Sequence, residues 1–70
     1  MEIKKGVYRH YKGNKYEVIS VARHSESLEE MVVYKALYGE GEIWVRPAFM
    51  WNDEIILADG SKVKRFTYVE

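Results

Sequence analysis

The segment ARHSESLEE, at residues 22–30, carries side chains that perform acid–base and nucleophilic chemistry in enzymes. Histidine changes charge near neutral pH, so His24 could act as acid or base with Glu26 orienting it, and Ser25 could be a nucleophile. Adjacent residues of a strand point to opposite faces, however, and the sequence shows neither a third catalytic member nor an oxyanion hole. We therefore favour a hydrogen-bonded turn in which Ser25, Glu26 and Ser27 bind nearby backbone groups.

A metal site or a bound cofactor is not expected. His10 and His24 show no tight His-x-His or His-x₃-His spacing, so a third ligand would have to come from Glu26 or Asp53. The chain has no cysteine, which excludes thiolate zinc ligands, disulfides and a thiol nucleophile. Glycine-rich phosphate loops and the HExxH motif are also missing from the sequence. An enzyme is therefore the less favoured class of protein.

Four arginines fall inside predicted strands, next to apolar residues: Arg9, Arg23, Arg46 and Arg65. The planar guanidinium suits bidentate pairing with a carboxylate or phosphate, and it stacks on aromatic rings. Two interpretations stay open. The arginines could pair internally with Glu26, Glu29, Asp53 or Glu54 and brace a thin core, which is the commoner fate of half-buried charges. Alternatively, they could form an anion-binding surface on one face.

Aromatic residues gather around the middle of the chain: Tyr34, Tyr38, Trp44 and Trp51. Tyr34 and Trp44 could face each other across neighbouring strands. An exposed aromatic face beside Arg46 would be a stacking platform for a base, a proline-rich peptide or a cation. The alternative is ordinary core packing, because so small a barrel needs its rings inside.

Turn residues divide the chain into strands that would position these groups. KGNK (12–15) separates the aromatic run 6–11 from the alternating run 16–23, which predicts a first hairpin. GEGE (39–42) separates the apolar runs 31–38 and 43–47. An Asp-Gly turn at 59–60 separates the β-rich runs 54–58 and 61–69. The chain therefore reads as successive hairpins.

The segment 27–38 is ambiguous. Ser27 with Glu30 fits a helix capping box and Gly39 fits a helix stop, so a helix over 28–38 is possible. The β-branched and aromatic content of this run favours a pleated strand, and we prefer the hairpin. Pro47 should end the strand before it, and residues 48–53 should form a single-turn link. That link should place Phe49, Met50 or Trp51 in the core.

The composition fits one small soluble domain over residues 1–70, because chains of this length cannot support two cores. Five or six short antiparallel strands must curl to bury their apolar face, which predicts a mainly β, SH3-like, partly open barrel. Neither a signal peptide nor a long apolar run is visible, so we expect a cytoplasmic protein with no membrane partner. Zero net charge argues against strong nucleic-acid binding, although lysines near the first turn leave that alternative open.

Several blocks of the sequence, in order, resemble the small bacterial family named domain of unknown function 1653. These blocks are YRHYKGNKYEV, ARHSESLEEMVVYKALYGEG, WVRPAFM and GSKVKRF, and together they span about residues 6–69. The resemblance implies a compact, single-domain, cytoplasmic bacterial protein and supplies no activity. The chain departs from the family pattern at Ser27, Trp51, Asp53 and Lys64, where we expect Thr, Phe, Glu and Pro.

The hypothesis we favour is a non-enzymatic binding or adaptor module that recognises a peptide or an anionic group through an aromatic and arginine surface. Trp44, Arg46 and Tyr34 would form its contact core. The remaining candidates would form a polar rim or flank: Arg9, His24, Ser25, Glu26 and Arg65. A nucleic-acid-binding module is the first alternative, and a small enzyme that uses His24 as acid or base is the second.

Overall fold

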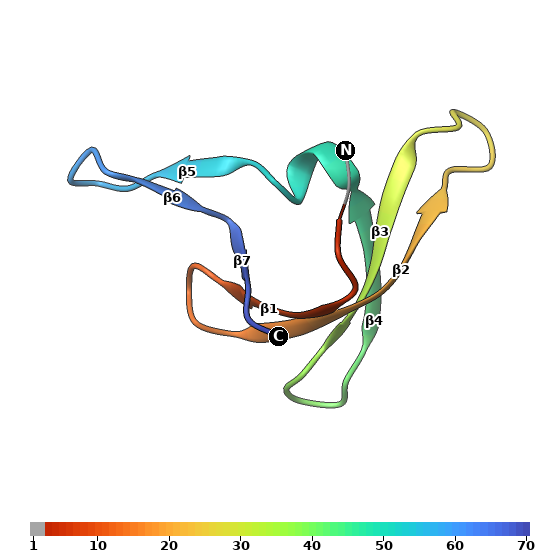
Figure 1. The fold of residues 1–70 in the computed structure, drawn as a ribbon, viewed down its shortest axis with the longest axis horizontal. Helices are drawn as coiled ribbons and strands as arrows, with labels where there is room; N and C mark the ends of the chain where they lie inside the picture. The colour runs from red at the N-terminus through yellow and green to blue at the C-terminus, as the bar shows by residue number, and fades with distance from the viewer. Residues whose placement is uncertain (1–2) are drawn as a thin grey trace.

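The structure, a computed structural model, describes residues 3–70; residues 1 and 2 of the predicted domain lie outside the described part. The described chain forms seven strands and one 3₁₀ turn (Figure 1): β1 (Gly6–His10), β2 (Lys15–Arg23), β3 (Glu30–Ala36), β4 (Ile43–Pro47), η1 (Ala48–Met50), β5 (Glu54–Ile56), β6 (Lys62–Lys64) and β7 (Phe66–Tyr68). Five strands make an antiparallel sheet in the order β4-β3-β2-β1-β7, while β5 and β6 pair as a separate ribbon.

The two hairpins predicted in the first two-thirds of the chain are confirmed. In the β1–β2 turn, the His10 N–H donates to the Asn14 carbonyl at 2.7 Å and the Gly13 N–H donates to the His10 carbonyl at 2.7 Å. Residues 30–36 form a strand rather than a helix, and β3 pairs with β4 so that Tyr34 lies directly opposite Trp44. The β-branched and aromatic side chains of this run therefore outweigh its capping residues.

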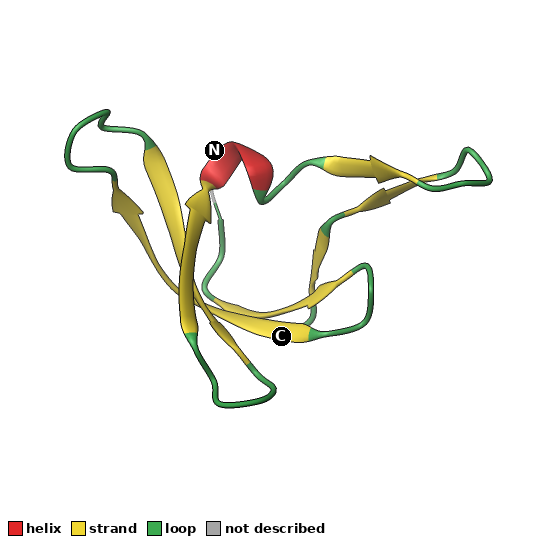
Figure 2. Ribbon diagram, turned by 180° about the vertical axis from the view of Figure 1, so that it is seen from behind, coloured by secondary structure: helices red, strands yellow, loops and turns green. Residues whose placement is uncertain are grey.

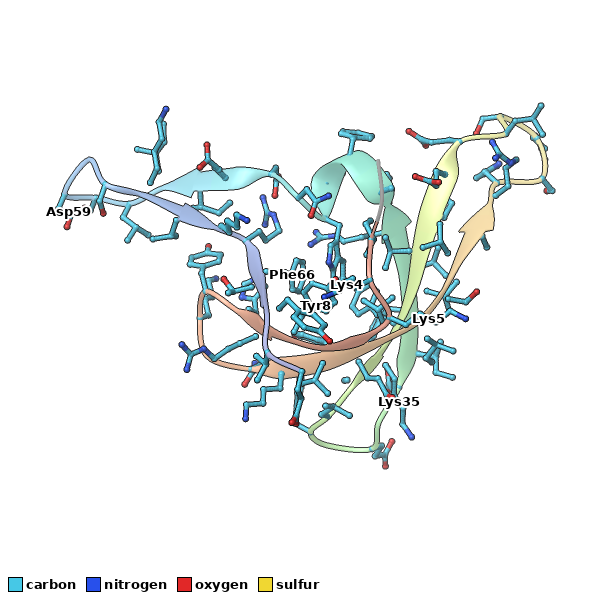
Figure 3. The ribbon with its side chains drawn as sticks, viewed as in Figure 1. Lys4, Lys5, Tyr8, Lys35, Asp59 and Phe66 are labelled. Carbon is cyan, nitrogen blue, oxygen red and sulfur yellow. The ribbon has the colours of Figure 1, made fainter. Side chains whose placement is uncertain are left out.

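A bulge in β2 curls the large sheet. The register of β2 against β3 shifts between Val18 and Ser20, so Ile19 is the extra residue. A bulge bends its strand and increases the local twist. Figure 1 shows the result, a curled sheet with a hollow inner face and an outer face. Tyr8 and Phe66 point into the hollow, whereas Lys35 lies on the outside (Figure 3).

The last predicted run, 61–69, divides at Arg65. Its first half, β6, pairs with β5, and its second half, β7, pairs with β1. The division gives seven strands in the described chain. The β5–β6 ribbon projects away from the five-stranded sheet, as Figure 2 shows, and the barrel does not close. The prediction of a mainly β fold with a partly open barrel of short antiparallel strands is confirmed; its SH3-like character stays a prediction.

The core is an aromatic cluster held by the link after β4. As predicted, that link forms a single 3₁₀ turn and places one aromatic ring inside: Trp51 is 0% exposed, whereas Phe49 is 59% exposed. The Trp51 ring stacks on Phe66 with centroids 3.8 Å apart and planes 4° apart. Tyr8 meets Trp51 edge-on at 5.3 Å. The inner face of the sheet is therefore closed by one tryptophan from a connection rather than by a second sheet.

No helix within residues 3–70 has the length and apolar character needed to cross a membrane.

Candidate functional site

The predicted contact core lies on the inner face of the sheet. Tyr34 and Trp44 are cross-strand partners, and Arg46 follows Trp44 by two residues, opposite the fully buried Val32. Because side chains alternate along a strand, all three project to the same face. Trp44 is 50% exposed, and the Arg46 guanidinium carbon lies 5.5 Å from the Phe66 ring centroid. Tyr34, Trp44 and Arg46 are called the inner-face site below.

The Arg46 guanidinium has no carboxylate partner in the described chain. Within residues 3–70 the ion pair between Arg65 and Asp53 is the one that forms. Arg46 instead lies against an aromatic ring, where a guanidinium is held by cation–π attraction and keeps its hydrogen-bond donors available. Burial raises the pKa of Tyr34, and the positive charge of Arg46 offsets part of that rise. Arg46 is thus a positioned cation that can bind an acidic group.

Arg65 is occupied internally. Its Nε donates to Asp53 Oδ1 at 2.7 Å and its Nη2 donates to Asp53 Oδ2 at 3.1 Å. This bidentate hydrogen bonding lowers the pKa of the Asp53 carboxyl. The pair closes the junction between β6 and β7, where the Arg65 N–H also donates to the Asp53 carbonyl at 3.1 Å. For this arginine the internal-pairing interpretation describes the structure, and Arg65 does not join the inner-face site.

A depression of about 270 Å³ adjoins Trp44 near the β3–β4 turn. Tyr38 and Trp44 supply its aromatic wall, and Glu40 and Glu42 supply its charge. The surface along β4 therefore changes from acidic at Glu42 through aromatic at Trp44 to basic at Arg46. These three side chains lie on one face, two residues apart, so a ligand along β4 would contact them in that order.

The segment 24–29 forms the hydrogen-bonded turn that its polar residues indicated, though the acceptor is different. The His24 ring, rather than Ser25 or Glu26, does the capping: its Nδ1 accepts from the Glu26 N–H at 3.1 Å and from the Ser27 N–H at 3.3 Å. Ser27 Oγ accepts from the Glu29 N–H at 3.2 Å. Leu28 takes a positive φ of 64° to complete the turn. Both His24 and its neighbours are exposed, and no contact aligns a nucleophile with a base.

The remaining rim candidates do not border the inner-face site. Arg9 alternates with the buried Tyr8, so it projects from the outer face, between Lys15 on β2 and Thr67 on β7. His24, Ser25 and Glu26 lie in the β2–β3 turn, at the opposite end of β3 from the β3–β4 turn (Figure 1). The structure therefore brings together Tyr34, Trp44 and Arg46, and leaves the other candidates in three separate places: the outer face, the β2–β3 turn and, for Arg65, the junction of β6 and β7.

Tyr16 and His10 line the inner face beside this site, a place that sequence reasoning did not anticipate, since His10 was considered only as a metal ligand. The Tyr16 and Tyr38 hydroxyls lie 2.8 Å apart, and Tyr16 meets Tyr34 edge-on at 5.5 Å. The His10 ring lies 5.0 Å from Phe66, and burial, followed by the charges of Arg65, Lys12 and Arg46, lowers its pKa. Period-two alternation could have placed both residues on the inner face once Tyr8 is taken as buried. Tyr8 pairs with Tyr16 across the hairpin, and His10 follows Tyr8 by two residues.

The Tyr16 hydroxyl should give the fold a distinct alkaline limit. Burial, together with the hydrogen bond to Tyr38, raises the pKa of Tyr16 to about 12, whereas an unfolded tyrosine ionises near 10. A raised pKa in the folded state means that this contribution to stability is complete below pH ~10 and is lost as pH approaches ~12. We expect the free energy of unfolding to fall across that window.

Tyr38→Phe tests this pH dependence, because it removes the hydrogen bond that helps to keep Tyr16 protonated. Ultraviolet titration of tyrosinate should show late-ionising tyrosines in the native protein, because burial raises the pKa of Tyr8 and Tyr34 as well as that of Tyr16, and one of them should ionise earlier in the variant. Tyr11→Phe is the control, because it removes the hydroxyl of an exposed tyrosine whose ring lies against His10, with centroids 4.6 Å apart. A native protein whose tyrosines all ionise together near pH 10 would contradict this account.

None of the described residues form a group of three or more His, Cys, Asp or Glu side chains that could hold a metal ion. The fold and the site together define a small, mainly β protein with a curled antiparallel sheet and an aromatic and arginine surface on one face.

The chain belongs to the family described as "Protein of unknown function (DUF1653)", whose profile matches residues 6–68. The chain is similar to a DUF1653 protein from Bordetella bronchiseptica of known crystal structure. The two share 37% sequence identity with a TM-score of 0.86, over 97% of this chain and 88% of the other. No curated protein shows significant similarity to the chain. The resemblance noted in the sequence blocks is thereby confirmed.

Proposed function

We propose that this protein is a non-enzymatic binding module that holds an extended peptide along the open edge of β4. The observation that carries the proposal is the character of this edge strand. Within the described residues β4 pairs with β3 alone, and three consecutive apolar side chains on it are exposed: Ile43 by 61%, Trp44 by 50% and Val45 by 56%. Edge strands usually carry charges or are covered, because a bare apolar edge invites another strand.

The backbone of β4 supports strand addition. The Ala36 N–H donates to the Glu42 carbonyl at 2.9 Å, which fixes the phase of the ladder between β3 and β4. Hydrogen-bonding direction alternates along an antiparallel strand, so the N–H and C=O groups of Ile43 and Val45 point away from β3. An added peptide strand would pair with these groups and gain main-chain hydrogen bonds, as in other cases of recognition by β-augmentation.

The side chains along β4 select the ligand. Alternate residues of an added strand would lie over Glu42, Trp44 and Arg46, two residues apart on the inner face. A complementary ligand has a basic residue beside Glu42, an aromatic or apolar residue beside Trp44 and an acidic residue beside Arg46, at every second position of its strand. The ligand class is therefore an extended peptide of alternating character, with a carboxylate that binds Arg46 and an apolar side chain against Trp44.

Titration with two capped peptides tests the proposal. One carries Lys-x-Phe-x-Glu and the other carries the reverse order, because strand addition can be parallel or antiparallel. We expect one order to bind more tightly than the other, since only one can match Glu42 and Arg46 together. Arg46→Gln should weaken the better peptide about tenfold, the value of one charged hydrogen bond. Arg9→Gln is the matched control, because this arginine projects from the outer face.

Two outcomes would overturn the proposal. The first is equal binding of both peptide orders with no loss in Arg46→Gln. The second is a stable dimer in sedimentation, at the concentrations of the titration, that Val45→Lys converts to monomer. In that case the β4 edge would serve a second copy of the chain instead of a peptide.

A further inference from the structure

A second depression lies apart from β4, between the β1–β2 turn and the junction of β6 and β7. Its volume is about 340 Å³. Arg9, Lys12 and Lys64 supply three cationic side chains to its lining, Thr67 supplies a hydroxyl, and no acidic residue among residues 3–70 lines it. The Lys12 Nζ lies 5.8 Å from the Tyr11 ring centroid, so the ammonium group is held beside the wall of the depression. We call this the basic depression.

Arg9, which lines the basic depression, also lies opposite a like charge outside it. Arg9 on β1 is the cross-strand partner of Lys15 on β2, and such like-charged pairs are destabilising. Glu17 follows Lys15 by two residues and Glu54 lies opposite Lys64, yet neither glutamate forms an ion pair within the described chain. Solubility alone does not require the cations of the basic depression to lie close together. An anion bound in the depression would reduce the repulsion between them.

The environment of His10 reports the same positive potential. His10 lines the basic depression, and its Nδ1 accepts from the Lys12 N–H at 3.1 Å. Burial is the first cause of its lowered pKa, and the neighbouring charges of Arg65, Lys12 and Arg46 lower that pKa further. The positive charges around the neutral His10 ring disfavour its protonation. The same charges favour an anion bound nearby.

We infer that the basic depression binds a phosphate-type oxyanion, such as the phosphate group of a small molecule. The Arg9 fork suits two phosphate oxygens at once, Lys12 and Lys64 serve as point charges, and the Thr67 hydroxyl can donate to a further oxygen. This site shares no residue with the β4 surface. The inference of anion binding can therefore be tested independently of peptide binding.

Titration of the whole chain with inorganic phosphate and with pyrophosphate tests the inference, with sodium chloride used to hold ionic strength constant. We expect saturable amide shifts in nuclear magnetic resonance spectra, confined to Arg9, Gly13, Lys64 and Thr67. Arg9→Gln and Lys64→Gln should each weaken binding about tenfold. Arg46→Gln, which removes a cation outside this depression, is the matched control and should change the affinity much less. Arg9→Gln is thus the test variant for phosphate binding and the control for peptide binding, and Arg46→Gln is the reverse.

The pKa of His10 gives a second readout. A bound dianion favours the protonated imidazole, so the pKa of His10 should rise when pyrophosphate is present and should rise less in Arg9→Gln. Shifts that grow linearly without saturation would overturn the inference, as would equal losses in Arg9→Gln and Arg46→Gln. A single-stranded oligonucleotide that binds where pyrophosphate does not would also overturn it, in favour of nucleic-acid recognition.

Discussion

Trp51→Ala is expected to destabilise the protein by about 3–5 kcal/mol, the usual cost of truncating a buried tryptophan. Trp51 is completely buried and stacks on Phe66, while Tyr8 and Tyr34 contact its other sides. It closes the hollow side of a single curled sheet, so no second layer can collapse into the space it leaves. A domain of this length has roughly 4–10 kcal/mol of stability in total, which makes the expected loss a large share.

Urea denaturation followed by circular dichroism measures this loss. Phe49→Ala is the matched control, because Phe49 belongs to the same turn yet is exposed; its cost should stay within about 0.5 kcal/mol. Trp51→Phe adds a second comparison. The buried Trp51 Nε1–H has no hydrogen-bond partner among residues 3–70, and phenylalanine removes that unpaired donor while it keeps most of the ring. Trp51→Phe should therefore cost far less than Trp51→Ala; similar costs for the two would contradict the packing described.

Gly6→Ala is expected to destabilise the protein by about 2–4 kcal/mol, because backbone strain and a steric clash combine. Gly6 has a φ of +137°, and an added Cβ would lie 2.5 Å from the Glu70 carbonyl oxygen and 3.0 Å from the Tyr68 ring. That same carbonyl accepts from the Val7 N–H at 2.7 Å. The methyl group would therefore push away the segment after β7 and loosen its pairing with β1.

Gly13→Ala separates strain from clash. Gly13 also has a positive φ, +109°, but no heavy atom lies within 4 Å of the position its Cβ would take. Its substitution should cost only the backbone strain, about 1 kcal/mol. Amide hydrogen exchange should show faster exchange at Val69 in Gly6→Ala and unchanged exchange there in Gly13→Ala. Equal losses of stability in the two variants would mean that Glu70 is not packed against Gly6.

Local signals in the sequence were sufficient for the strands and most turns. Gly13 provides the positive φ of the first hairpin turn, the Asn14 carbonyl accepts from the His10 N–H there, and the alternation of Tyr16 and Val18 sets the inner face. The pairing of Tyr34 with Trp44 followed from the spacing of the central runs about the GEGE turn. These features depend on residues close in sequence, which is why a single sequence could indicate them.

Features that depend on distant residues were beyond such reasoning. The run 61–69 divides at Arg65 because Arg65 binds Asp53, twelve residues earlier, and nothing in the alternation marks that break. Which aromatic ring enters the core, Phe49 or Trp51, depends on the direction in which the 3₁₀ turn leaves β4. The bulge at Ile19 is likewise defined only by the register of β2 against β3, and the alternation of the sequence does not mark it.

The three central residues of the candidate site were predicted from the sequence, whereas the residues that surround them were not. Tyr34, Trp44 and Arg46 share a face because they lie on paired strands, a relation that period-two alternation captures. The separation of Arg9 from the inner face follows from the same alternation relative to Tyr8, but only when the buried side of β1 is known. The His24 ring capped its own turn, a role that the polar composition of the segment did not reveal.

The two tryptophans provide the most direct measurement of the central claim, which is that β4 and its exposed ring form the peptide-binding surface. Each indole N–H gives its own nuclear magnetic resonance signal, and Trp44 is half-exposed while Trp51 is fully buried. During titration with the better of the two alternating peptides, we predict that the Trp44 indole signal shifts and saturates and that the Trp51 signal stays in place. A Trp44 signal that does not move at saturating peptide would contradict the account.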